Sequence, residues 1–210
     1  MTNATSQKYA LAIHTASADL GLAISNFAGD ERVQSWSLNR DLSTHLHIYL
    51  TEFLQPQTWK DLMFLAVARG PGGFTGTRIG VVAARTLAQQ LEIPLFAVST
   101  LTAIAWMHRA SNFSTDAVPD LAIQMQAQRG EIHTAIYSAN LQTRLADTIM
   151  SQLQWQQVLD QWQHPYRLIQ AESGLGTTAA GVLDLGYQDW QRGDRPDWSE
   201  ALPFYGQSPV

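Results

Sequence analysis

The sequence predicts a mixed α/β fold, in which helices cover the faces of a sheet that contains both antiparallel and parallel strands. Three short strands at residues 9–15, 20–25 and 33–38 follow one another with only turns between them, as in an antiparallel meander. Strands and helices then alternate as far as residue 107. That second pattern is typical of parallel strands joined by crossover helices.

The remaining elements of the first half follow from the spacing of apolar residues. A helix is predicted at residues 44–54, where the large apolar side chains fall on one helical face. The uninterrupted apolar run at 62–68 is typical of a buried strand. Small residues at 75–91 predict a second helix, and a strand at 94–98 and a helix at 99–107 follow it. This order of elements suits a ribonuclease-H-like lobe.

The second half predicts a smaller α/β lobe. The polar, turn-rich segment at 111–116 marks the boundary between the two lobes. Beyond it, two paired strands, a helix, a third strand and a last helix are expected at residues 119–126, 132–138, 153–162, 167–170 and 177–190. The expected domain organisation is a flexible tail at 1–8, a first lobe at 9–110, a second lobe at 118–192 and an irregular tail at 193–210.

The composition is that of a globular protein with little charge. Of the 210 residues, 45% are hydrophobic and 15% are charged, and the formal net charge is −5. The absence of cysteine excludes disulfides and thiolate metal sites. The apolar runs are too short for a membrane span and the polar start lacks a signal core, so a cytoplasmic location is expected. Because no Lys/Arg-rich block occurs, we expect any contact with RNA to be auxiliary.

The glycine-rich residues 70–80, Gly-Pro-Gly-Gly-Phe-Thr-Gly-Thr-Arg-Ile-Gly, lie between a predicted strand and a predicted helix. In this setting backbone N–H groups at a helix N-terminus can bind an anion, and Thr75 is a candidate N-cap. The segment lacks both the Gly-Lys-Ser/Thr ending of a P-loop and the glycine spacing of a Rossmann turn. We expect no cofactor. Two interpretations stay open: a structural turn, or a vestigial phosphate loop formed by Gly70, Gly72, Gly73, Thr75 and Gly76.

Residues 69–80 also resemble the signature of the bacterial TsaB (YeaZ) family. The match continues in residues 9–16, in 93–101 and in the hairpin segment 129–132. It is close over the first half of the chain and looser over the second. The resemblance implies the fold of the actin, sugar-kinase and chaperone superfamily, with a ribonuclease-H-like lobe and a reduced second lobe.

The resemblance also implies a role without catalysis. Proteins of this family are non-catalytic partners in the complex that transfers a threonylcarbamoyl group to the adenosine beside the tRNA anticodon. They are degenerate relatives of its catalytic subunit. The implied partners are therefore this catalytic paralogue and the ATPase subunit of the complex, with a homodimer when the chain is alone. Contact with tRNA is expected to be indirect, and no contact with a membrane is expected.

Three positions argue against phosphoryl transfer by this chain. Superfamily members that use ATP carry an acid at the end of the first strand, where this sequence has His14 and where the family usually has Asp. Gln126 and Gln128 stand where the family hairpin has an Asp-x-Arg pair. Imidazole cannot replace a hard oxygen ligand of Mg²⁺, and phosphoryl transfer depends on such charged groups. We expect no enzymatic activity; the alternative is an ATP-dependent small-molecule kinase of the same superfamily.

No metal site is expected from the histidines. The catalytic relatives hold a metal with two histidines spaced i, i+4 on a helix, whereas here Tyr49 follows His45 at that distance. His47 lies about 200° around the helix from His45, so the two side chains cannot chelate one ion.

The predicted helix at 75–91 has too few polar residues for a helix with one face in water, which indicates a second buried surface. One interpretation is a partner interface, as the resemblance implies; the other is that the helix at 44–54 covers this surface. The residues expected at a partner interface are Ile48, Thr51, Gly80, Ala84 and Leu87.

Overall fold

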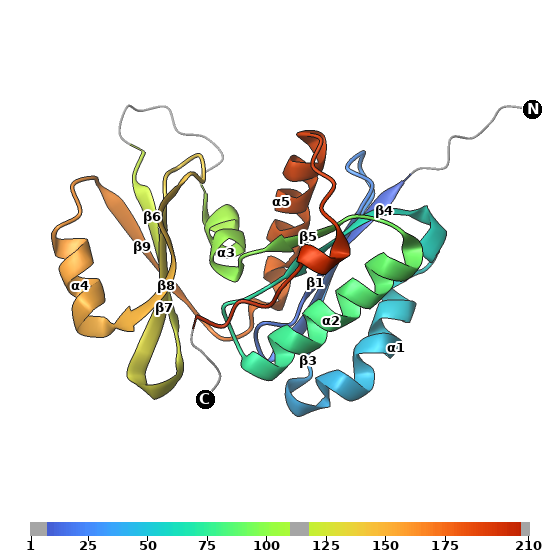
Figure 1. Ribbon diagram of the computed structural model, residues 1–210, viewed down its shortest axis with the longest axis horizontal. Helices are drawn as coiled ribbons and strands as arrows, with labels where there is room; N and C mark the ends of the chain where they lie inside the picture. Colours follow the sequence, from blue (N-terminus) through green and yellow to red (C-terminus); the bar gives the residue numbers. More distant parts are fainter. Residues whose placement is uncertain (1–7, 110–117, 207–210) are drawn as a thin grey trace, which may run out of the picture.

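Two β-sheets with helices packed on them make up the computed structural model, which describes residues 8–109 and 118–206 (Figure 1). The five-stranded sheet has the order β3-β2-β1-β4-β5. β1 is antiparallel to β2 and parallel to β4, and β5 is parallel to β4. This mixed sheet confirms the predicted ribonuclease-H-like arrangement. Strands β1 to β5 are Tyr9–His14, Asp19–Ser25, Glu31–Ser37, Leu62–Ala68 and Leu95–Val98.

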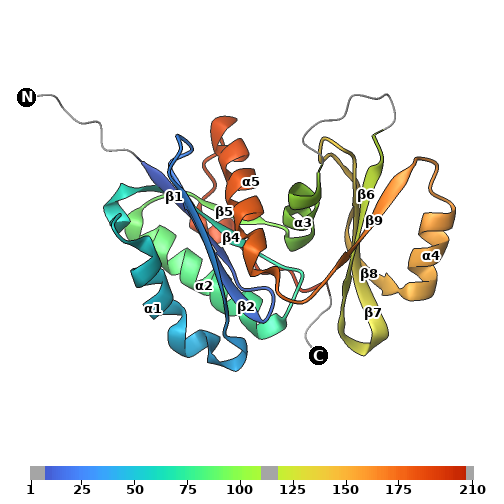
Figure 2. The same ribbon diagram turned by 180° about the vertical axis from the view of Figure 1, so that it is seen from behind.

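Helices cover both faces of the five-stranded sheet (Figures 1 and 2). α1 (Leu42–Leu54) and α2 (Phe74–Leu91) lie on one face, and α5 (Ala179–Gln191) lies on the other. Because side chains alternate along a strand, β1 contributes to two cores. Its larger residues, such as Leu11, pack in the core beneath α1 and α2, whereas the small Ala12 packs in the core beneath α5.

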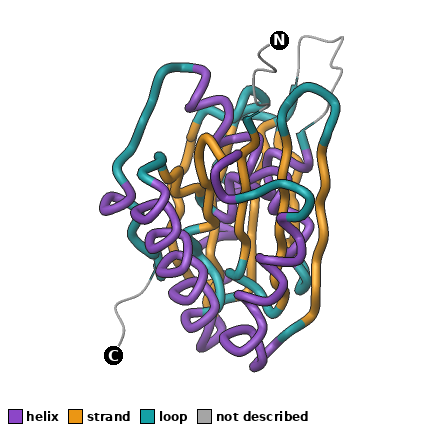
Figure 3. Tube along the Cα trace, turned by 90° about the vertical axis from the view of Figure 1, so that its right-hand side faces the viewer, coloured by secondary structure: helices purple, strands orange, loops and turns teal. Residues whose placement is uncertain are grey.

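The four-stranded sheet has the order β8-β7-β6-β9. α4 (Gln152–Asp160) packs on one of its faces, and α3 (Thr100–His108) packs on the other, between this sheet and α5. A view from the side shows the strands of the molecule between helices (Figure 3). Strands β6 to β9 are Asp120–Gln126, Glu131–Tyr137, Thr143–Ser151 and Tyr166–Ala171.

Two elements differ from the sequence-based prediction. β8 was not expected, because none of its residues is fully buried and its apolar alternation is weak. α5 was expected in the second lobe, but it packs on the five-stranded sheet instead. Glycine allows this close contact, since a Cβ atom at Gly186 would lie 3.1 Å from the Cβ of Ala66. A hydrophobic face specifies that a helix is buried, but it does not specify which sheet buries it.

Five short 3-10 helices complete the described part of the chain, and none of its helices is both long enough and apolar enough to cross a membrane. These 3-10 helices, η1 to η5, are Asn39–Asp41, Trp59–Asp61, Gln128–Gly130, Leu175–Thr178 and Trp198–Glu200.

Candidate functional site

The glycine-rich loop joins β4 to α2 and packs against the turn between β1 and β2. The N–H of Gly73 donates a hydrogen bond to the carbonyl oxygen of Ala16 at 2.8 Å. A Cβ atom at Gly72 would lie only 2.1 Å from this same oxygen. At Gly76, a Cβ atom would lie 2.3 Å from the carbonyl oxygen of Thr15. These close approaches explain glycine at both positions as a packing requirement.

The start of α2 differs from the prediction. Gly73 is the N-cap and the helix begins at Phe74, so Thr75 is an exposed residue inside the first turn. No side chain caps this end of the helix. The N-cap conformation therefore depends on the backbone contact between the loop and the β1–β2 turn.

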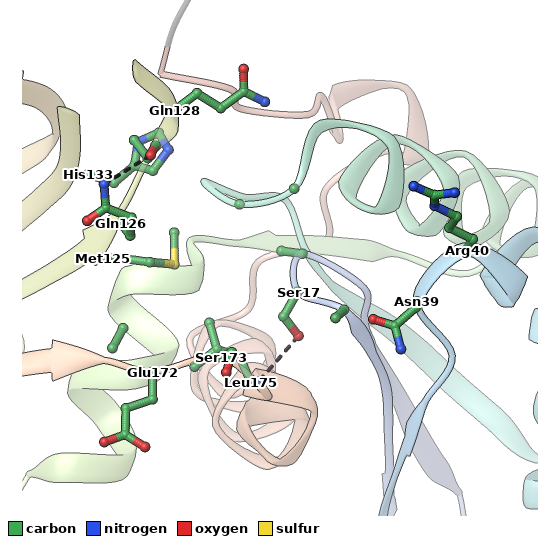
Figure 4. Close-up of a pocket in the computed structure, with 16 residues that line it drawn as sticks. Ser17, Asn39, Arg40, Met125, Gln126, Gln128, His133, Glu172, Ser173 and Leu175 are labelled. Atoms are coloured by element: carbon green, nitrogen blue, oxygen red, sulfur yellow. Dashed lines mark hydrogen bonds between the residues drawn. The ribbon is translucent and has the colours of Figure 1, made fainter. Parts of the chain in front are cut away.

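A cleft of about 620 Å³ opens beside this loop, between the two sheets (Figure 4). Arg40 and Glu172 are exposed charged residues of its lining. The remaining labelled residues are uncharged side chains and one histidine: Ser17, Asn39, Met125, Gln126, Gln128, His133, Ser173 and Leu175. The residues after β1 and β3 were not singled out from the sequence, because no local motif marks them; only the fold brings them to the cleft.

Two of the five predicted loop residues and the two hairpin glutamines come together in this cleft, whereas Gly70, Thr75 and Gly76 do not line it. Gly72 and Gly73 lie on one side, and Gln126 and Gln128 lie on the other. The amide of Gln126 donates to the backbone oxygens of its own hairpin at 3.3 Å, which turns it toward the hairpin. The cleft therefore has neutral amides at the two positions where the resemblance implied an Asp-x-Arg pair.

Both buried histidines near the cleft are neutral at physiological pH. His14 is completely buried, and this burial lowers its pKa to about 4. Burial also lowers the pKa of His133, which is 5% exposed and lines the cleft. His14 cannot present a charged group to a ligand in the cleft, because its side chain is enclosed by the core.

The described part of the chain contains no group of three or more metal-ligating side chains that could hold an ion. His45 lies on α1, where its Nδ1 is 3.1 Å from the carbonyl oxygen of Asp41. His47 is exposed on the same helix and lines a groove between α1 and α2.

The expected partner residues divide into two groups. Gly80 and Ala84 are buried against the chain's own sheet, and a Cβ atom at Gly80 would lie 2.0 Å from the hydroxyl oxygen of Thr15. The expectation that these two residues form a partner surface is therefore wrong, because the small side of α2 allows the helix to approach the sheet. Ile48 is 41% exposed and Thr51 is also exposed.

The exposed side of α1 and α2 contains an apolar groove of about 330 Å³. Thr51 and Leu87 of the expected surface line this groove. Val82, which is 53% exposed, lies one helical turn before Thr86 in the groove wall. Ile48 lies on α1 one turn before Thr51, so each helix carries an exposed apolar side chain within one turn of a groove residue.

Comparison with known proteins identifies the family. The family model described as TsaD, tRNA N6-adenosine threonylcarbamoyltransferase, matches residues 40–172. The tRNA threonylcarbamoyladenosine biosynthesis protein TsaB of Bacillus subtilis is 32% identical over 119 residues, which cover 55% of this chain and 49% of that protein. The TsaB protein of Escherichia coli is 39% identical over 77 residues, which cover 37% of this chain and 32% of that protein. The chain thus spans about half or less of the length of these curated relatives.

The fold agrees with this family. The structure of YeaZ from Pseudomonas aeruginosa has a TM-score of 0.72 and 22% identity, and the match covers 94% of this chain and all of that chain. This likeness shows the shared fold, and the family model and the relatives show the family. The chain therefore belongs to the TsaB (YeaZ) family of tRNA threonylcarbamoyladenosine biosynthesis proteins and carries the TsaD-like domain of the family model.

Proposed function

We propose that this chain is a non-catalytic subunit of the assembly that transfers a threonylcarbamoyl group to the adenosine beside the tRNA anticodon, and that it stabilises the catalytic paralogue. The observation that carries this proposal is the packing of the glycine-rich loop. The Gly73 N–H at the start of α2 already donates to Ala16, and the backbone of Thr15 and Ala16 fills the space beside Gly72 and Gly76. One of the backbone donors that an anion at this helix N-terminus would use is therefore already engaged within the chain.

The charges of the cleft support the same proposal. ATP-dependent phosphoryl transfer depends on groups that hold Mg²⁺ and stabilise the charge that develops on the phosphates. His14 is buried and neutral, and Gln126 and Gln128 are neutral amides. The cleft therefore lacks charged groups at three positions where a small-molecule kinase would need them to hold Mg²⁺ and the phosphates.

We further propose that the catalytic paralogue docks on α1 and α2 at the groove that Thr51 and Leu87 line. Ile48 and Val82 lie within one helical turn of groove residues and are 41% and 53% exposed, respectively. Exposed apolar side chains gathered on two neighbouring helices are typical of an interaction site. The same surface is proposed for the homodimer, and the ATPase subunit then binds the assembled pair. With a net charge of −5, the chain contacts tRNA only through its partners.

Two measurements on the purified chain test this function against the kinase alternative. A tagged chain should retain the catalytic paralogue during co-purification from the cell in which both are made. The isolated chain should neither hydrolyse ATP in the presence of Mg²⁺ nor transfer its γ-phosphate. Magnesium-dependent hydrolysis that is lost when Arg40 and Gln126 are replaced by alanine would establish a working cleft and overturn the proposal.

A further inference from the structure

The last described residues cross from one half of the molecule to the other. η5 packs on α2 and β5, and Ala201 is buried in the core of the five-stranded sheet. From there the chain, red in Figure 1, runs past the glycine-rich loop to β7. We call Phe204, Tyr205 and Gly206 the C-terminal strap.

The strap is attached to the five-stranded half at both ends of the glycine-rich loop. The N–H of Phe204 donates to the carbonyl oxygen of Arg69 at 2.7 Å. Gly70 has a φ of +98°, and a Cβ atom there would lie 2.2 Å from the carbonyl oxygen of Phe204. At the other end of the loop, the rings of Phe74 and Tyr205 lie 4.4 Å apart, measured between centroids. Glycine at position 70 is therefore required by the strap as well as by its own backbone conformation.

The same strap contacts the four-stranded sheet through Gly206. A Cβ atom at Gly206 would lie 2.9 Å from Cε1 and 3.0 Å from Nδ1 of His133, which is a residue of β7. It would also lie 3.9 Å from the Cβ of Ile149 in β8. His133 is 5% exposed and lines the cleft, so the strap contacts a residue of the cleft wall. In Figure 4 the strap crosses the top of the view, above the labelled His133.

The two halves are also joined at α3 and at η4, which follows β9, packs on β2 and β3, and contacts α3. Leu101 and Ile104 of this helix pack in the core of the four-stranded sheet. At its N-terminus, the Ser99 hydroxyl donates to Asp147 of β8, which also accepts from the Tyr137 hydroxyl at 2.8 Å. Figure 4 shows α3 at the lower left, on the opposite side of the cleft from the strap. A packed helix alone permits rotation about the contact, whereas a second attachment across the cleft opposes it.

We propose that the C-terminal strap is a clamp that fixes the angle between the two sheets and so sets the width of the cleft. Release of Gly206 from His133 lets the four-stranded sheet rotate about the neighbouring contacts of α3 and η4. The clamp would set the space available to any molecule that binds in the cleft or contacts both halves. This inference does not depend on the function proposed above.

The absence of native cysteine allows a direct test, because two introduced cysteines can be spin-labelled without side reactions. Val33→Cys in β3 and Leu168→Cys in β9 are suitable, since these side chains are 40% and 45% exposed and lie on different sheets. Pulsed electron paramagnetic resonance then measures the distance between the labels. The full chain and a chain ending at Gly206 should give the same narrow distribution. A chain ending at Pro203 should give a broader distribution with a shifted mean.

A full-length pair of variants provides a second test, in case the shortened chain is unstable. Gly206→Val introduces a side chain against His133, and Gly193→Val is its control. Both glycines have a left-handed φ, +69° and +97°, but no atom lies within 4 Å of a Cβ at Gly193. Only Gly206→Val should broaden the label distance and increase amide hydrogen exchange in residues 132–134 of β7. Distributions that are identical in the full chain, the chain ending at Pro203 and both variants would overturn the proposal.

Discussion

Single atoms determine how the glycine-rich loop can be used. The carbonyl oxygens of Thr15 and Ala16 face Gly72 and Gly76 at distances that leave no room for a side chain. The loop is thus a contact between two backbone segments that are about sixty residues apart in the sequence. Sequence alone predicts that glycine is needed here, but it does not distinguish a bound phosphate from a packed turn. The contact across the fold shows that packing by itself requires glycine at positions 72 and 76.

Two neighbouring glycines provide a test of this packing requirement. Gly72→Ala should destabilise the protein by roughly 1–3 kcal/mol, because the added carbon would lie 2.1 Å from the Ala16 oxygen and must displace backbone. Gly73→Ala is the matched control, since a Cβ there would be 3.8 Å from the same oxygen. Chemical denaturation of both variants measures the difference. Equal losses of unfolding free energy would mean that the close approach at Gly72 is not what requires glycine.

The buried His14 predicts a specific dependence of stability on pH. Its pKa falls from 6.5 to about 4 on folding, so between these values the unfolded chain binds more protons than the folded one. The contribution of His14 to the free energy of unfolding is greatest above pH 6.5. It falls as the pH drops and changes no further below about pH 4. The total loss is about 3 to 4 kcal/mol, since the pKa shifts by about two and a half units and each unit corresponds to about 1.4 kcal/mol.

Denaturation of the native chain and of His14→Asn across this range measures that contribution. The variant should show a weaker fall in unfolding free energy between pH 6.5 and 4, because it has no group to titrate at this position. The same slope in both proteins would show that His14 is accessible to protons in the folded state. His133 is present in both proteins, so its own lowered pKa does not affect the comparison.

At the scale of elements, α2 has one side for the sheet and another for solvent. Its small residues Gly80 and Ala84 face the sheet, whereas Val82 and Thr86 are exposed. Periodicity predicted α2 and the other long helices, and it predicted that α2 has too little polar surface. Periodicity did not show which side of α2 faces the sheet, because both sides are apolar. The side with the small residues was therefore predicted to be the partner surface. Packing against Thr15 makes that side part of the core.

Arginine substitutions on the two sides of α2 should therefore affect different properties: partner binding on the exposed side and folding on the side that faces the sheet. Val82→Arg should leave the fold intact but weaken binding of the catalytic paralogue at least about tenfold, because burial of an unpaired guanidinium costs several kcal/mol. Gly80→Arg should prevent folding, since Thr15 occupies the space. Gln90→Arg, an exposed change on the same helix, is the control. Circular dichroism reports folding, and calorimetric titration with the paralogue reports binding. Normal binding by Val82→Arg would place the interface elsewhere.

At the scale of the whole molecule, the two halves are joined at α3, at η4 and at the C-terminal strap, with a cleft of about 620 Å³ between them. The sequence predicted the five-stranded sheet well, because its strands and helices alternate with clear periodicity. It predicted the second half less well, because β8 is only partly buried and α5 returns to the first sheet. The strap was expected to be irregular, and its contacts are visible only once distant segments are brought together.

We propose that this chain supports catalysis by another subunit without performing it. Reconstituted transfer of the threonylcarbamoyl group to tRNA tests it most directly, with the catalytic paralogue and ATPase subunit present and the chain added, omitted or replaced by Val82→Arg. We predict transfer with the native chain, and little transfer without the chain or with Val82→Arg. Variants in which His14, Gln126 or Gln128 is replaced by alanine should support undiminished transfer, provided that they remain folded. Full transfer without the chain, or loss of transfer on replacement of the cleft glutamines alone, would contradict this account.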